Sequence, residues 1–403
     1  MKRTSRTLLM AVVLTGLLAG CGGVRGTPTA SELDVRKFDV GSYPVDRYHY
    51  KQSAGDKSAL LEGMRMSEAV VPTVRIDPSL VVGRGSRVLV DPKDAVATGA
   101  LSNTAEPILR NRGMLVGYAI SGADKPDPPG KDTPGPDATA LTLRVLRFPS
   151  DSVAKLAARE INDADFDVAS GQNRRLSLAQ YPDAFVHWRP GVANVGMFMA
   201  YREFVLIAFV ARPRAEEKDL TDWARKVLDA QIPMLDRFQP TPADKIDQLR
   251  IDPDNLLARV VTDKRDDGRA PDLDKFAVYG PTSLIHLAKD ETVRDKLVTD
   301  TGVDAVAVLD GNSVIRVRDS KAGEALVSGL ITTNSPYYFP VNGPPNVPDV
   351  KCLHLDKRGN QERDYLNRCY VVYKRYVGLV NSDDDTDIRY KVAAQYALFA
   401  NSL

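Results

Sequence analysis

The sequence predicts an α+β fold of two related domains, each a small, mainly antiparallel sheet with helices packed on one face. Three observations carry this prediction. Segments with strand and helix patterns follow each other as strand, helix, strand, strand, helix before residue 240, and the same order recurs after it. A stretch with two prolines and no apolar periodicity, residues 239–247, separates the halves. The 403 residues are enough for two ordinary domains.

The first residues indicate export and lipid attachment. Three basic residues precede an apolar run over residues 8–18, which is too short to cross a bilayer and is typical of a secretory signal. Leu18-Ala19-Gly20-Cys21 has the form of a lipobox, in which the cysteine sulfur takes diacylglycerol and the new amine takes an acyl chain such as palmitate. Two or three chains anchor a protein stably. We therefore expect a signal peptide over 1–20 and a lipid anchor at Cys21, on the extracytoplasmic face of the cell membrane; the alternative is a plain secretory signal.

The first domain is expected over residues 36–240, after a flexible tether over 21–35. Its opening segment, residues 36–55, is rich in aromatic residues, and we expect it to form an extended arm that packs on that domain. A proline- and glycine-rich loop over 121–137 separates two strands. The sequence predicts helices over 57–70, from Ser150 and over 216–236, and strands over 111–120, 141–147, 185–188, 195–201 and 204–210.

The second domain is expected over residues 241–403, although the charged stretch 263–275 is an alternative boundary. Asp310-Gly311-Asn312 predicts a hairpin between two strands, and Gly302 a helix C-terminus. The sequence predicts strands over 276–279, 303–309, 313–317, 351–355 and 370–380, and helices within 283–299, from Asp319 to about 330, and over 388–402.

Charge and cysteine content narrow the possible functions. The chain has 54 basic and 53 acidic residues, and loss of the three basic residues in segment 1–20 leaves 51 against 53, a net charge of −2. Such a balance argues against nucleic acid as a partner. With Cys21 used for lipid, Cys352 and Cys369 remain, and outside the cytoplasm such a pair predicts a disulfide. A metal or reactive thiol site is the alternative.

No catalytic residue is identified in the sequence, and no metal or other cofactor. The four histidines form neither HxH nor HxxxH, and no serine lies in GxSxG. A triad assembled in space remains open. The acidic run over 383–387 fits either a helix N-terminus or a calcium site. Tyr337, Tyr338 and Phe339, framed by prolines, are candidate ligand contacts for a glycan or lipid, or else hold their loop against the core.

Several stretches together resemble a family of uncharacterised actinobacterial lipoproteins of the Nocardia or Mycobacterium type. Besides the lipobox, they are FDVGSYP (38–44), RMSEAVVPTVRIDPSL (65–80), IDPDNLLARVV (251–261), VYGPTSLIHL (278–287) and VDAVAVLDGNSVIRVRD (303–319). The resemblance implies a two-domain envelope protein. It implies no activity and no site residues.

The sequence therefore favours a membrane-anchored envelope lipoprotein that binds a ligand or a protein partner of unknown identity. The motivation is an anchor, a tether and two domains without a catalytic motif. Two alternatives remain: an envelope hydrolase with a site assembled between the domains, and a lipid or glycan carrier.

Overall fold

The computed structural model describes residues 33–97, 101–266, 268–333 and 336–402. The predicted signal peptide, Cys21 and nearly all of the tether lie outside these residues. Val35–Leu403 forms one compact unit. None of its described helices is long and apolar enough to cross a membrane.

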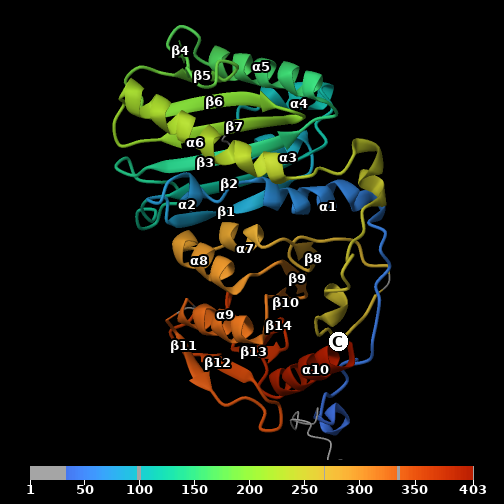
Figure 1. Ribbon diagram of the computed structural model, residues 1–403. Coiled ribbons are helices and arrows are strands. Elements are labelled where there is room, and N and C mark those ends of the chain that lie inside the picture. Colours follow the sequence, from blue (N-terminus) through green and yellow to red (C-terminus); the bar gives the residue numbers. More distant parts are fainter. Residues whose placement is uncertain (1–32, 98–100, 267, 334–335, 403) are drawn as a thin grey trace, which may run out of the picture. The chain divides into compact units, whose positions relative to one another are not determined.

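Two seven-stranded antiparallel sheets organise the described residues (Figure 1). The N-terminal sheet has the strand order β1-β2-β3-β7-β6-β5-β4, and the C-terminal sheet has the order β11-β12-β13-β14-β10-β9-β8. Read from β8, the second order repeats the first, since each sheet has its first strand at one edge and its fourth at the other. The predicted fold class, α+β with two related domains, is confirmed.

The strands of the N-terminal sheet are β1 (Val82–Leu89), β2 (Val116–Ala123), β3 (Ala140–Arg147), β4 (Arg174–Leu176), β5 (Phe185–Trp188), β6 (Asn194–Tyr201) and β7 (Phe204–Ala211). Its helices are α1 (Ser58–Arg65), α2 (Thr73–Ile76), α3 (Pro92–Val96), α4 (Ala105–Asn111), α5 (Asp151–Asp167) and α6 (Glu217–Arg237). The C-terminal strands are β8 (Phe276–Tyr279), β9 (Ala305–Leu309), β10 (Asn312–Arg316), β11 (Tyr338–Val341), β12 (Val350–Leu355), β13 (Asn367–Tyr373) and β14 (Tyr376–Ser382). The C-terminal helices are α7 (Thr282–His286), α8 (Glu291–Thr301), α9 (Ser320–Thr332) and α10 (Asp387–Ser402).

Capping and turn residues explain where several elements begin and end. Ser150 accepts a hydrogen bond from the Val153 amide at the start of α5, and Asp319 accepts one from Ala322 at the start of α9. Gly302 ends α8 in the left-handed conformation, at φ +60°. Asp310 and Gly311 both have positive φ and turn β9 into β10, as the sequence predicts.

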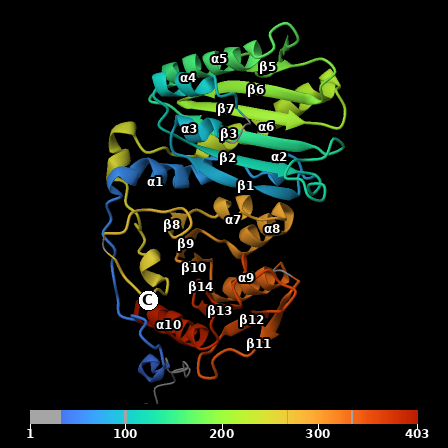
Figure 2. The same cartoon turned by 180° about the vertical axis from the view of Figure 1, so that it is seen from behind.

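Helices cover both faces of each sheet, which corrects the prediction of helices on one face. Along β7, Phe204 and Leu206 contribute to the core beneath α6, whereas Val205 and Ile207 contribute to the core beneath α5. In the C-terminal half, α9 and α10 likewise belong to different cores. The physical reason is that the central strands are apolar at successive positions, so both faces need cover. Figure 2 shows the two sheets from behind.

A buried glutamine marks the duplication at the residue level. Gln231 in α6 donates to the Ala69 carbonyl over 2.6 Å and accepts from the Val71 amide over 3.0 Å. In the second half, Gln395 in α10 makes the same two bonds to Arg259 and Val261, over 2.8 and 3.0 Å. Each glutamine is fully buried and satisfies one backbone donor and one acceptor in the segment that precedes its own sheet.

The cysteine pair joins neighbouring strands of the C-terminal sheet. Cys352 in β12 lies directly opposite Cys369 in β13, with 2.05 Å between the sulfur atoms. The structure thus pairs the two cysteines as the sequence predicts, and the disulfide bridges the strands on either side of the β12–β13 loop.

The aromatic arm that the sequence assigns to the first domain contacts the second one. Phe38 packs edge-to-face on Tyr396 of α10, and the Tyr43 hydroxyl donates to Asp387 over 2.5 Å. Tyr50 packs edge-to-face on Phe276 of β8. These rings fill apolar surface beside α10 and β8, and the chain enters the N-terminal sheet only afterwards (Figure 1).

Candidate functional site

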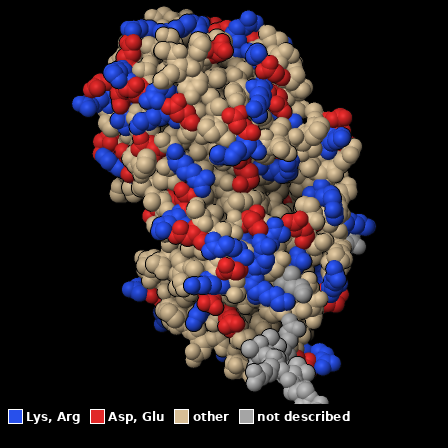
Figure 3. Space-filling view, viewed as in Figure 1, with Lys and Arg blue, Asp and Glu red and all other residues tan. Residues whose placement is uncertain are grey.

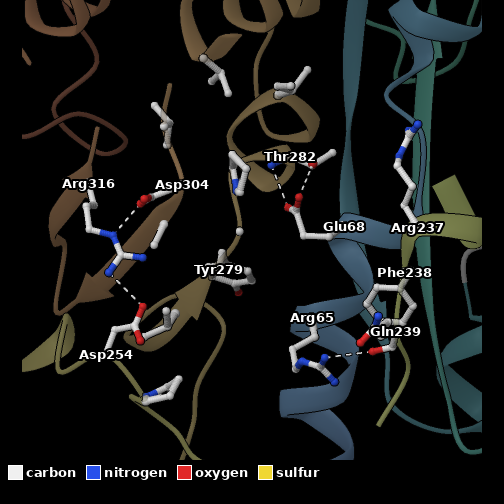
Figure 4. A pocket seen from close by; sticks show the side chains of 18 of the residues that line it. Arg65, Glu68, Arg237, Phe238, Gln239, Asp254, Tyr279, Thr282, Asp304 and Arg316 are labelled. Atoms are coloured by element: carbon white, nitrogen blue, oxygen red, sulfur yellow. Dashed lines mark hydrogen bonds and ion pairs between the residues drawn. The ribbon is translucent and has the colours of Figure 1, made fainter. Parts of the chain in front are cut away.

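A cleft of about 910 Å³ lies where residues from both halves of the chain meet (Figure 4). Its lining includes α1, the end of α6, the 249–254 segment, β8 and the starts of α7 and β9. A volume of this size falls in the range typical of small-molecule sites, which also prefer domain junctions. Five arginines and three acidic residues line it: Arg65, Arg75, Arg237, Arg250 and Arg316 against Glu68, Asp254 and Asp304.

The C-terminal side of the cleft carries an ordered ion-pair network. The Arg316 guanidinium binds Asp304 over 2.6 Å and Asp254 over 2.9 Å. Asp304 also binds Arg375, over 2.6 Å. The positive charge of Arg316 is therefore balanced within the protein, and Figure 4 shows its side chain between the two carboxylates.

The opposite side is held by a buried carboxylate at Glu62. This fully buried side chain binds Arg147 over 2.7 Å and Arg65 over 2.6 Å, and it accepts the Thr241 amide over 3.0 Å. Arg65 also donates to the Gln239 carbonyl over 3.1 Å. The segment after α6 is thereby fixed against α1, which positions Phe238 and Gln239 along the cleft.

Two carboxylates connect the halves in opposite directions, and one of them, Glu68, lines the cleft. Glu68 accepts the Thr282 amide over 2.8 Å and the Thr282 hydroxyl over 2.6 Å, at the start of α7. Glu291 at the start of α8 accepts the Thr73 hydroxyl over 2.9 Å and the Val74 amide over 3.0 Å, in α2. Burial raises the pKa of both carboxyl groups, and these hydrogen bonds oppose that rise.

Arg237 and Arg250 differ from the other arginines of the cleft. Both are exposed, and neither forms an ion pair with an acidic residue in the part of the chain that is described. The Arg237 guanidinium donates a hydrogen bond to the Met234 sulfur over 3.0 Å. In Figure 4, Arg237 rises beside Phe238, and Tyr279 lies between that side and the Arg316 network. The cleft thus combines unbalanced guanidinium charge with aromatic surface, which is a suitable environment for an anion.

The candidate contacts Tyr337, Tyr338 and Phe339 lie away from this cleft, in and beside the edge strand β11. The Tyr338 hydroxyl donates to the Tyr365 carbonyl, which holds its loop, while Tyr337 and Phe339 are exposed. Cys352 and Cys369 lie in the adjacent strands. Cys21 is outside the described residues.

The described histidines do not form a nucleophile–base pair. His187 is buried between Asn162, 3.1 Å from Nδ1, and Asp165, 3.0 Å from Nε2, with no hydroxyl or thiol bonded to it among the described residues. His286 is buried, and burial lowers its pKa to about 3. Over the described ranges, no group of three or more His, Cys, Asp or Glu side chains is placed to hold a metal ion. Asp384 and Asp387 instead accept hydrogen bonds around the start of α10.

Comparison with known proteins places both halves in one family. Residues 49–251 match the N-terminal domain of unknown function DUF7373, and residues 256–402 match its C-terminal domain. The chain belongs to the DUF7373 family. No curated protein matches the DUF7373 chain. One solved structure that matches is the extracellular domain of PknH from Mycobacterium tuberculosis, at 11% identity and a TM-score of 0.27, over 46% of this chain and 100% of that one. A TM-score this low carries no argument about function.

The residues of the DUF7373 cleft were not identified from the sequence. Arg237 and Arg250 flank the proline-containing stretch that marks the predicted boundary, so the boundary itself was the available signal, because clefts form where domains meet. Glu68 lies in a stretch that resembles the family but carries no chemical motif. Its partner Thr282 is 214 residues away, a pairing that only the fold creates.

Proposed function

We propose that this DUF7373 chain is a lipid-anchored binding module of the cell envelope that holds an anionic ligand in the cleft between its two halves. The observation that carries the ligand class is the pair Arg237 and Arg250, exposed in the cleft without an acidic partner among the described residues. The anchor rests on the lipobox at Leu18-Ala19-Gly20-Cys21.

The lining supports a ligand that has an anionic group and an apolar or ring portion. Guanidinium groups bind carboxylates and phosphates through paired hydrogen bonds. Phe238 and Tyr279 offer aromatic surface, and Leu61 and Ile285 offer aliphatic surface. The backbone near Arg237 is fixed by the Glu62 network, so the site is largely formed before a ligand arrives, which lowers the entropic cost of binding.

Binding is favoured over hydrolysis by the composition of the cleft. Its described lining contains no histidine, and its carboxylates are engaged: Glu68 with Thr282, and Asp254 and Asp304 with Arg316. A general base needs a free acceptor within reach of the reacting group. A carrier of a neutral lipid is disfavoured for a different reason, because five arginines line the space.

The test is native mass spectrometry of the full chain purified from its own envelope, together with two charge reversals. Arg237→Glu places a negative charge in the cleft. Arg159→Glu, on an exposed face of α5 outside the cleft, makes the same charge change elsewhere. We expect a bound anionic mass on the wild type and on Arg159→Glu, and at least about tenfold lower occupancy on Arg237→Glu, equivalent to the loss of one charged contact. A clean protein mass for the wild type, or equal occupancy in both variants, contradicts the proposal.

A further inference from the structure

The outer edge of the C-terminal sheet exposes apolar side chains. Phe339 and Val341 in β11 are 45 and 38% exposed, and Tyr337, just before the strand, and Tyr365, in the adjoining loop, are each 38% exposed. These four residues are called the β11 edge below. The Phe339 ring packs edge-to-face on His354, and the Arg358 guanidinium lies 5.5 Å from the Tyr337 ring centre. Sheet edges of this kind are normally protected by charge.

The duplicated fold supplies an internal comparison. β4 occupies the same place in the N-terminal sheet as β11 does in the C-terminal one, since each is the fourth strand and the outer edge. β4 is protected: Arg174 binds Glu217 over 2.6 Å and Arg175 binds Asp163 over 3.2 Å. Because the same fold keeps one edge charged, an apolar edge is not a requirement of the topology. The difference indicates a surface with its own function.

We infer that the β11 edge lies in the headgroup region of the membrane that carries the Cys21 lipid, an inference that rests on the anchor proposed above. The tether of thirteen residues, 22–34, spans at most about 45 Å when fully extended. It continues into the arm, where Phe38 and Tyr43 contact α10. The arm is therefore held by the same domain that carries β11, and β11 is the sheet edge furthest from β8 and the first domain.

The chemistry of the edge fits a membrane interface better than another protein chain. Tyrosine rings accompanied by arginine are typical of the level where lipid headgroups meet acyl chains. The Arg368 guanidinium lies 5.0 Å from the Tyr338 ring centre, in the same arrangement as Arg358 and Tyr337. Pro340 in the middle of β11 has no N–H to donate, which weakens strand addition by a second chain. Basic and acidic residues are nearly balanced between 337 and 368. Binding of this region to a membrane therefore needs no anionic lipid, and a zwitterionic bilayer is sufficient. Figure 3 shows basic and acidic side chains interspersed over the face that it views.

The experiment places one fluorescent label at each of the two equivalent edges. Cys352 and Cys369 are paired, and Cys21 is taken by lipid in the proposed form, so a single added cysteine is the only free thiol. The full chain with Phe339→Cys is compared with Arg175→Cys, which occupies the matching edge. Each residue lies opposite a histidine of the neighbouring strand, His354 and His187. Both proteins are reconstituted into phosphatidylcholine vesicles, with bromine placed about 5–10 Å deep in the acyl chains to quench a label at the interface.

We expect loss of emission from the label at position 339 and none from the label at 175. Tyr337→Cys, a second position on the β11 edge, should behave as 339 does. Unquenched labels at 339 and 337 on vesicle-bound, lipidated protein overturn the docking inference and leave the anchor intact. Energy transfer between copies at position 339 without quenching assigns the edge to a second chain instead. An intact mass without acyl chains at Cys21 overturns the anchor and this inference together.

Discussion

At the scale of single residues, the junction between the two halves contains buried titratable groups with opposite pH effects. Burial lowers the pKa of His286 to about 3, so the folded protein keeps this imidazole neutral while the unfolded chain protonates it near pH 6.5. Burial raises the pKa of Glu68 and Glu291, so the folded protein protonates these carboxyls before the unfolded chain does. Acid therefore destabilises the fold through His286 and stabilises it through the two glutamates.

Replacing His286 by phenylalanine should remove the acid-sensitive contribution. Between pH 6.5 and 3 the unfolded wild type binds one more proton at this residue than the folded protein, so stability falls as pH falls. We expect the free energy of unfolding of the wild type to decrease relative to His286→Phe by about 1.4 kcal/mol per pH unit below about 6.5. Urea unfolding at pH 7, 6 and 5 measures the difference, and parallel pH profiles for the two proteins would show that His286 is charged in the fold.

At the scale of elements, two buried glutamines make the same pair of backbone hydrogen bonds in the two halves. Gln231 connects α6 to the 69–71 segment, and Gln395 connects α10 to the 259–261 segment. A fully buried side chain amide is costly unless both of its polar ends are bonded, and here both are. These hydrogen bonds fix the position of each helix along its axis relative to the segment that precedes the sheet.

Gln395→Leu should destabilise the protein by about 2–5 kcal/mol, because it leaves the Val261 amide and the Arg259 carbonyl buried without a partner. Gln231→Leu should have a similar effect on the first half. The matched control is Gln172→Leu at an exposed position, for which we expect a change within about 0.5 kcal/mol. Chemical denaturation of the three variants measures the differences, and a Gln395→Leu protein as stable as the control would refute the role of the glutamine.

Individual elements show what the sequence can and cannot predict. Ser150, Gly302 and Asp310-Gly311 act over a few residues, so their capping and turn roles follow from local chemistry. Helices cover both faces of a sheet where its strands are central and apolar on both sides. The apolar pattern of each strand does not predict which strands become central, so it does not predict where the helices pack. The cleft could not be predicted for a related reason. Arg237 and Arg250 line a cleft only because the fold brings together segments that are far apart in the chain.

At the scale of the whole described unit, Glu68 and Glu291 couple the two halves. Each carboxylate bonds two donors of the other half, so the contacts run in both directions. The Arg75–Asp295 ion pair adds a more exposed contact, which contributes less.

The double variant Glu68→Ala, Glu291→Ala should uncouple the halves. It leaves four buried or half-buried donors without acceptors, at about 1–3 kcal/mol for each unsatisfied group. We expect one calorimetric unfolding transition for the wild type and two for the variant, since each half retains its own core. Asp295→Ala is the control and should keep a single transition. A single transition in the double variant would mean that the remaining contacts, which include the arm and the backbone hydrogen bonds of Gly83 and Glu291, are enough to couple the halves.

The arm has a consequence for the order of folding. Tyr43 bonds Asp387, 344 residues later, and the Asn401 side chain donates to the Val45 carbonyl across 356 residues. A ribosome makes the arm first and its binding surface last, so these contacts close only when synthesis is finished. The domain that binds the arm is thus the last to be completed, and a truncated chain would present a first half whose arm lacks its binding surface.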